Sequence, residues 1–261
     1  MQVGSNGVII SFWSMREIAE AFWIYGVNPV REALRSSVPV KKVVLAQERS
    51  KALRELVELA SQRGTKVEFR TKGELSNLFS GVPHQGVSAL IERFHYWDPL
   101  DLLNREGDPL LLILDQIQDP RNLGALLRTA EGLGFWGVIV PKRRSAKIGG
   151  VVAKASAGAL FHIPIARVSN LSQTIRLLKE KGIKVIGGEA KAQKTVFEAD
   201  LRGPIALVIG GEEEGIRPLV QRNCDLIVSI PLKGKINSLN ASVAGAILMY
   251  EIIRQRNQIL T

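Results

Sequence analysis

Three short stretches of this 261-residue chain combine glycine with polar side chains that could hold a ligand or take part in a reaction. The first, 115–134, reads DQIQDPRNLGALLRTAEGLG, and the second, 209–218, reads IGGEEEGIRP. The third, 230–251, reads IPLKGKINSLNASVAGAILMYE and passes from an apolar strand end through a polar loop into a helix. Such a loop exposes unpaired backbone N–H groups beside short polar side chains. It is therefore suited to bind a ligand.

The acidic turn 210–215 is not a phosphate-binding loop. It lacks the glycine spacing of the common nucleotide fingerprints, and its three consecutive carboxylates would repel a pyrophosphate. A cationic ligand matches that charge better. The sulfonium of S-adenosylmethionine is such a cation, and its adenosine can pack against backbone where glycines leave room. Read alone, however, the segment is better explained as an acidic surface turn between a strand and a helix.

Arg128 lies among leucines and alanines of a predicted helix over 122–133. An arginine on so apolar a helix needs an anionic partner or a ligand, and a structural salt bridge would serve equally well. Asn122 lies near the start of the same helix and is a good N-cap by residue type. The two residues are about 1.7 turns apart, so they cannot share one narrow stripe of the helix.

Other chemistries are disfavoured by the composition. His84, His95 and His162 are scattered without metal-ligand spacing, so we expect no metal site. Ser238 lacks the glycine elbow of a serine hydrolase. The single cysteine, Cys224, excludes a disulfide framework and is consistent with a reducing cytoplasm.

The net charge of +10 and the pI near 9.9 favour a polyanionic partner, with nucleic acid the first candidate. A basic but merely solvated surface is the alternative. A basic stretch without acidic side chains among its charged residues follows a predicted strand, and we expect it to contact RNA. Its members are Lys142, Arg143, Arg144, Lys147 and Lys154. Lys41 and Lys42 belong to a second basic cluster, near the start of the chain, for which phosphate contact and a solvated surface are equally good explanations.

From position 110 onward, apolar runs alternate with helical patterns. The runs are continuous, which is typical of strands buried on both faces, so the sequence predicts an α/β fold with a parallel sheet. Ligands of such sheets bind outside the carboxyl ends of the strands, and all three stretches follow a strand end. The runs are LLLILD, GVIVP, FHIPIARV, KVIGGE, PIALVIG and LIVSIPL, and the helices span 122–133, 147–158, 171–181, 217–222 and 239–256.

The chain before this region forms a smaller α/β unit. Strands are predicted over 40–45, 65–70 and 86–92, and helices over 50–62 and 72–79. No window reaches the ~18 apolar residues of a membrane span. We divide the chain into an N-terminal extension (1–21, of which 1–14 have no expected role in the fold), a substrate-binding domain (22–93), a linker (94–108) and a C-terminal domain (109–261).

Taken together and in this order, the three stretches resemble the SpoU class of the SPOUT methyltransferases. The resemblance covers 110 to the C-terminus and rests on NLGALLRTA from Asn122, GGEEEG from Gly210 and IPLKG from Ile230 followed by SLNAS. The N-terminal unit resembles the ribosomal-protein-like substrate-binding domain of some members. With GVNPVREAL at 26–34, the whole arrangement is most similar to the bacterial 23S rRNA guanosine 2′-O-methyltransferases.

This resemblance implies a C-terminal trefoil-knot domain that binds S-adenosylmethionine, works as a homodimer with the site at the interface, and methylates a ribose hydroxyl of RNA. The implied reaction-site residues are Arg128, Asn122, Glu212, Ser238 and Asn240. The implied cofactor-binding residues are Gly210, Gly211, Gly215, Ile230, Leu232 and Leu239. Because arginine is a poor general base, we expect Arg128 to clamp the target phosphate and stabilise the alkoxide while the proton leaves to phosphate or water.

Three alternatives stay open at this stage. The substrate could be tRNA, or another rRNA site as in antibiotic-resistance members. A chain of this kind could also be a ribosome-assembly protein that binds RNA without catalysis, although the intact reaction-site residues argue against it. A nucleotide-dependent oxidoreductase is disfavoured because the dinucleotide fingerprint is missing.

Overall fold

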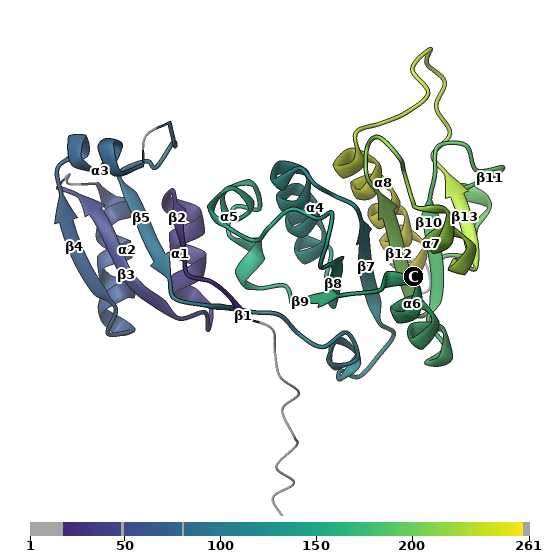
Figure 1. The fold of residues 1–261 in the computed structure, drawn as a ribbon, viewed down its shortest axis with the longest axis horizontal. Coiled ribbons are helices and arrows are strands. Elements are labelled where there is room, and N and C mark those ends of the chain that lie inside the picture. Colours follow the sequence, from purple (N-terminus) through teal and green to yellow (C-terminus); the bar gives the residue numbers. More distant parts are fainter. Residues whose placement is uncertain (1–17, 48–49, 80, 258–261) are drawn as a thin grey trace, which may run out of the picture.

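The computed structural model describes residues 18–47, 50–79 and 81–257 of the chain. Figure 1 shows a small N-terminal domain beside a larger C-terminal one, each built on a sheet with helices packed against it. The expectation that residues 1–14 have no role in the fold lies outside the described residues.

The N-terminal domain is a mixed four-stranded sheet in the order β2-β5-β3-β4, with only the β3–β4 pair parallel. The strands and helices predicted between 40 and 92 are confirmed within one or two residues. The prediction did not include the first strand and the first helix, which precede them. The elements are β2 (Phe22–Tyr25), α1 (Val27–Arg35), β3 (Val40–Ala46), α2 (Lys51–Gln62), β4 (Lys66–Arg70), α3 (Lys72–Leu78) and β5 (Val87–Ile91).

The C-terminal domain holds a seven-stranded sheet in which every pair is parallel, in the order β11-β13-β10-β12-β7-β8-β9. The predicted α/β class is therefore confirmed. Its elements are β7 (Leu110–Asp115), α4 (Pro120–Gly132), β8 (Gly137–Pro141), α5 (Gly150–Ala155), η2 (Ala159–Phe161), β9 (Ile165–Val168), α6 (Leu171–Glu180), β10 (Lys184–Gly188), β11 (Lys194–Thr195), η3 (Val196–Glu198), β12 (Ile205–Gly210), α7 (Pro218–Asn223), β13 (Leu226–Ser229) and α8 (Ala241–Asn257).

Three of these elements are shorter than the sequence pattern predicts. One is β13, which ends at Ser229 although the apolar run LIVSIPL continues to Leu232. Of the helix expected over 147–158, only α5 is helical. Gly158 has a left-handed backbone conformation, and the chain continues from it as η2. The run FHIPIARV becomes a strand only at Ile165, because its first residue, Phe161, ends that 3-10 turn.

The position of β7 in the middle of the sheet explains why its sequence is continuously apolar. Leu112 and Leu114 belong to the core under α4 and α8, while Leu111 and Ile113 belong to a second core under α6 and α7. Successive strand side chains point to opposite faces, so a strand covered on both sides must be apolar at every position. The sheet is thus the middle layer of a three-layer sandwich.

The helices α4 and α8 lie side by side on one face of the sheet (Figure 1). A Cβ at Gly245 of α8 would overlap the side chain of Leu126, so the missing side chain lets the two helices approach closely. Gly245 packs within the chain.

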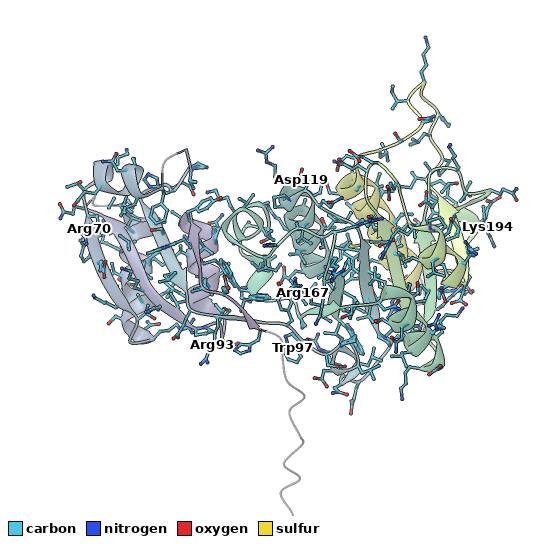
Figure 2. The ribbon with its side chains drawn as sticks, in the orientation of Figure 1. Arg70, Arg93, Trp97, Asp119, Arg167 and Lys194 are labelled. Carbon is cyan, nitrogen blue, oxygen red and sulfur yellow. The ribbon has the colours of Figure 1, made fainter. Side chains whose placement is uncertain are left out.

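The predicted linker 94–108 is held along the C-terminal domain. Its residues Phe94–His95 form β6, which pairs with β1 (Ile18–Ala19), and η1 (Asp101–Leu103) follows. The backbone N–H of Trp97 donates to the Ile165 carbonyl at 2.8 Å. Figure 2 labels Trp97 of this linker and Arg167 of the strand β9. Further contacts join the domains directly: His162 pairs with Glu32 at 2.9 Å, and α5 packs on β2.

None of the helices in the described ranges is long and apolar enough to cross a membrane.

Candidate active site

Two carboxylates at strand ends fix the acidic turn at the carboxyl edge of the sheet. Asp115, the fully buried last residue of β7, accepts hydrogen bonds from the backbone N–H and the Nε of Arg217 at 2.9 and 2.8 Å. Glu189, directly after β10, accepts the N–H of Ile216 at 2.5 Å. The chain leaving the turn is therefore held from both sides. Sequence reasoning assigned no role to either residue, although both are acidic residues that end or directly follow an apolar run.

The turn itself is tight and glycine-dependent. The N–H of Gly215 donates to the Gly211 carbonyl at 3.0 Å, and Gly215 has a φ of +64°. A Cβ at Gly210 would overlap the backbone of Gly215. Glycine at these positions lets the chain double back and leaves backbone exposed to a ligand.

The three motifs meet at Glu212. The amide of Asn122 donates to the Glu212 carboxylate at 2.6 Å, and the amide of Asn240 donates to the same oxygen and to Asn122 Oδ1. These residues lie 90 and 28 positions from Glu212 in the chain. Hydrogen bonds to an ionised carboxylate are stronger than neutral ones, so this cluster fixes the orientation of all three side chains.

Helix caps place both asparagines. Asp119 is the N-cap of α4 and accepts the N–H of Arg121 at 2.8 Å. The prediction that Asn122 could be the N-cap of this helix was therefore wrong. Asn122 lies inside the first turn, where its buried side chain points to Glu212. Asn240 uses Oδ1 to accept the N–H groups of Ser242 and Val243 at the start of α8, which aims its NH₂ at Glu212.

A cavity of about 410 Å³ opens on one side of the acidic turn. This volume is within the range of small-molecule sites, and its wall combines glycine backbone with branched apolar side chains and carboxylates. That wall suits a ligand with a flat apolar ring and a positive charge, so the residues fit S-adenosylmethionine. Besides the turn 211–215 the lining residues are Gly188, Glu189, Ala190, Lys191, Ile209, Gly210, Val228, Ile230, Leu232, Asn237, Ser238, Leu239, Ala241, Ala244 and Leu248.

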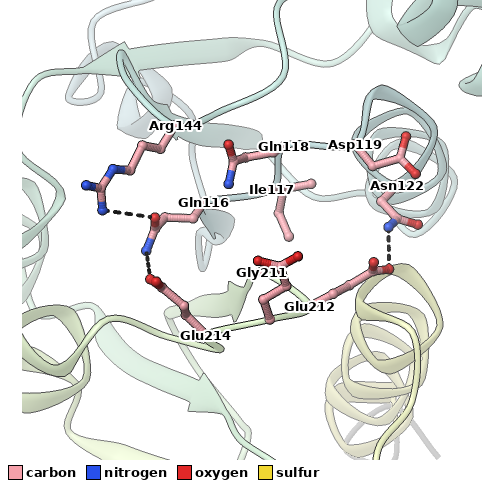
Figure 3. A pocket seen from close by; sticks show the side chains of 10 residues that line it. Gln116, Ile117, Gln118, Asp119, Asn122, Arg144, Gly211, Glu212 and Glu214 are labelled. Carbon is pink, nitrogen blue, oxygen red and sulfur yellow. Dashed lines mark hydrogen bonds between the residues drawn. The ribbon is translucent and has the colours of Figure 1, made fainter.

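A second cavity, of about 590 Å³, opens on the other side of the turn. Figure 3 shows Glu212 and Asn122 at one end, and Gln116, Glu214 and Arg144 at the other. Gly211, Glu212, Glu213 and Glu214 line both cavities, so the turn is their common wall. Ile117, Gln118 and Asp119 complete the lining.

All six predicted cofactor-binding residues and Ser238 line the smaller cavity. Arg128 lies elsewhere: its side chain is exposed, it lines neither cavity, and within the described part of the chain it has no hydrogen bond or ion pair. The structure of one chain therefore brings together Asn122, Glu212 and Asn240 but does not bring Arg128 to them.

The predicted RNA-binding residues occupy different settings. Lys41, Lys142 and Arg143 are exposed, and Arg144 reaches into the larger cavity. Lys42 is paired with Glu68 at 3.2 Å and lies over the ring of Trp23. Within the parts of the chain that the structure describes, no group of three or more His, Cys, Asp or Glu could hold a metal ion.

Two family models match the chain. Residues 109–250 match the SpoU rRNA methylase family, and residues 23–97 match the domain described as RNA 2′-O ribose methyltransferase substrate binding. A putative TrmH family tRNA/rRNA methyltransferase of Bacillus subtilis, YacO, is 40% identical over 242 residues, which is 91% of this chain and 97% of the relative. A relative of the same description from Staphylococcus saprophyticus is 41% identical over 245 residues, covering 92% and 98%.

Solved structures agree with this assignment. The SpoU methyltransferase AviRb of Streptomyces viridochromogenes, in complex with AdoMet, has a TM-score of 0.78 at 28% identity and 92% coverage of both chains. An AdoMet-bound rRNA methyltransferase of Sinorhizobium meliloti has a TM-score of 0.77 at 25% identity, with coverage of 90% and 87%.

Fold, site and comparisons together define an S-adenosylmethionine-dependent RNA methyltransferase. The chain belongs to the SpoU rRNA methylase family, with the N-terminal substrate-binding domain of that family. Its fold is that of the SpoU methyltransferases, as the sequence resemblance predicted.

Proposed function

We propose that this enzyme transfers a methyl group to the ribose 2′-hydroxyl of a guanosine in 23S rRNA, in the cytoplasm. The observation that carries the proposal is the pair of cavities with Glu212 in their common wall. A cofactor held in one cavity can then face a nucleoside held in the other. The N-terminal domain, matched to a ribose-methylase substrate-binding family, supports RNA as the molecule presented.

The residues of the chain have separable tasks in this reaction. S-Adenosylmethionine, when bound, supplies an electrophilic methyl group. Ile230, Leu232 and Leu239, with glycine backbone of the turn, would hold it, and Ser238 lies at the same cavity. Asn122 and Asn240 hold the Glu212 carboxylate in one orientation, from which it can accept the hydrogen bond of the target hydroxyl. The proton of that hydroxyl leaves to phosphate or water as its oxygen takes the methyl group.

We propose that Arg128 reaches this site from a second protomer, because within one chain it lines neither cavity. The surface of α8 offers an interface, since Val243, Ile247 and Tyr250 are exposed at helical spacing. In the homodimer, Arg128 of one protomer clamps the target phosphate in the site of its partner and stabilises the developing alkoxide.

Mixed dimers test the shared site. In a dimer of one Arg128→Ala subunit and one Glu212→Gln subunit, one of the two sites receives both intact residues. The mixed dimer should therefore recover about half of wild-type activity, which is well above the activity of either parent homodimer. No recovery would place Arg128 and Glu212 of the same subunit in one site.

The substrate is tested by mapping 2′-O-methyl groups in both rRNA and tRNA from cells with and without the gene. We expect one guanosine of 23S rRNA to lose its methyl group in the deletion strain and to regain it with the wild-type gene. A lost methyl in tRNA would redirect the proposal to tRNA, because relatives are described for both RNA classes. Unchanged patterns in both would support the non-catalytic RNA-binding alternative.

A further inference from the structure

The larger cavity has more room and more polar groups than the sugar of the target nucleotide needs. One end contains Glu212 and Asn122, which are hydrogen-bonded to each other, and the other end contains a separate hydrogen-bonded chain (Figure 3). Between them lies the apolar side chain of Ile117. This arrangement offers a polar site for the ribose, an apolar wall, and a second polar site at a distance from the reaction.

The second polar site consists of Arg144, Gln116 and Glu214, which come from three different loops. The Gln116 amide donates from Nε2 to the Glu214 carboxylate at 3.2 Å, and its Oε1 accepts from Arg144 Nη1 at 3.5 Å. Gln116 is buried, whereas Arg144 and Glu214 are exposed in the cavity. Their remaining hydrogen-bonding atoms are available: guanidinium donors on one side and carboxylate acceptors on the other.

Gln116 holds Arg144 and Glu214 in place through hydrogen bonds. Its amide NH₂ donates to Glu214 and its amide oxygen accepts from Arg144, so it orients an anion and a cation side by side. Gln116 and Arg144 also have positive φ angles of 62° and 55°, a left-handed conformation that non-glycine residues rarely adopt. The surrounding loops therefore place both side chains at a conformational cost.

We propose that Arg144 and Glu214 read the base of the target nucleotide and select guanine, with Gln116 as the positioning residue. Guanine presents O6 and N7 as acceptors, which match the donors of Arg144, and N1–H and the N2 amino group as donors, which match the Glu214 carboxylate. Adenine places an amino group opposite the arginine and an unprotonated N1 opposite the carboxylate. Uracil places O2 where the N2 amino group would lie.

This inference rests on the proposed ribose methylation, and the experiment separates the two. The wild-type enzyme is incubated with S-adenosylmethionine and with RNA from cells that lack the gene, and the methylated nucleosides are identified by mass spectrometry. The mapped target is then made as a synthetic rRNA fragment with guanosine, inosine or adenosine at the methylated position. The value of kcat/KM is measured for each fragment.

For the wild-type enzyme we expect inosine to lower kcat/KM on the order of 10-fold and adenosine on the order of 100-fold or more. In Glu214→Gln the preference for guanosine over inosine should fall towards one. In Arg144→Ala the preference over adenosine should fall. Gln116→Leu should weaken both preferences, whereas a merely structural role would lower all three rates together.

The control is Arg202→Ala, which removes an exposed arginine paired with Asp200 near the amino end of β12, on the opposite edge of the sheet. It should keep both preferences. Calorimetric binding of S-adenosylmethionine and thermal unfolding identify variants that have failed to fold, and Glu214→Asp then serves as the milder substitute. Equal rates on guanosine and inosine fragments, or unchanged preferences in folded variants, would overturn base reading and leave ribose methylation standing. Absence of any 2′-O-methyl nucleoside from the wild-type reaction would overturn both.

Discussion

At the scale of single residues, the proposed methyl transfer depends on Glu212. Its side chain is exposed, yet two amide groups from different motifs converge on one of its oxygens. One of these amides, that of Asn240, belongs to a residue that also caps α8. The sequence identified these three residues by family resemblance, because no local pattern relates residues that are 90 and 118 positions apart.

Replacing Glu212 by Gln should lower kcat/KM for methyl transfer roughly 10- to 100-fold, because hydrogen bonds to a charged acceptor contribute about 1.5–3 kcal/mol each. The measurement is a methyl-transfer assay with calorimetric binding of S-adenosylmethionine beside it. Glu213→Gln removes the same charge one position further along the turn and should cost less. Equal losses in the two variants would mean that charge alone matters, and not the hydrogen-bonded cluster.

Cys224 gives a pH-dependent prediction. Burial, and then the negative charge of Asp225, raise the pKa of its thiol to about 12. A raised thiol pKa keeps the neutral form dominant below it, so the thiolate fraction should rise about tenfold per pH unit between pH 7 and pH 9. Alkylation by iodoacetamide in the native protein should follow that slope and become much faster in urea. A rate that levels off below pH 9 would contradict the raised pKa.

At the scale of elements, the parallel sheet was predictable because strands covered on both faces must be apolar throughout. The hydrogen bonds that hold the acidic turn at the edge of the sheet were not predictable. Asp115 and Glu189 are acidic residues at strand ends, and only the three-dimensional strand order places both beside the turn that they hold. The approach of α4 to its neighbours was equally hidden, since it depends on which glycine faces which helix.

Gly124 tests that close packing. A Cβ there would overlap Ala155 of α5 and approach the backbone N of Ser156 to 2.9 Å. Gly124→Val should therefore lower the free energy of unfolding by about 1–3 kcal/mol, measured by urea denaturation, because overpacking forces the helices apart. Gly132→Ala, in the same helix, adds a Cβ that meets nothing within 4 Å and should leave stability unchanged or slightly higher. Two variants of equal stability would contradict the packing argument.

At the scale of the whole molecule, the two domains share a continuous apolar core and direct polar contacts. Glu32 and His162, 130 positions apart, are paired across the interface, and Lys154 donates to Gln85 at 2.7 Å. Lys154 thus hydrogen-bonds to the N-terminal domain, although the sequence predicted that it belongs to a basic stretch in contact with RNA. The sequence could predict two domains and a basic surface, but not which basic residues are used to hold the domains together.

The basic surface predicts a salt effect. If Lys142 and Arg143 contact phosphates, their joint replacement by Gln should reduce the slope of log affinity against log salt by about 0.7 per lost contact on single-stranded RNA. Filter binding of an rRNA fragment at several salt concentrations measures the slope. Arg202→Gln is the matched control and should leave it unchanged. An unaltered slope in the double variant would remove both residues from the RNA surface.

Methyl transfer to a ribose oxygen is distinguished from methylation of a base by the chemistry of the product. RNA methylated by the wild-type enzyme with labelled S-adenosylmethionine is hydrolysed in alkali, which cannot cleave the phosphodiester next to a 2′-O-methyl group. We predict that the label appears in alkali-resistant dinucleotides. Label recovered only in mononucleotides, as a methyl group on the base, would contradict ribose methylation.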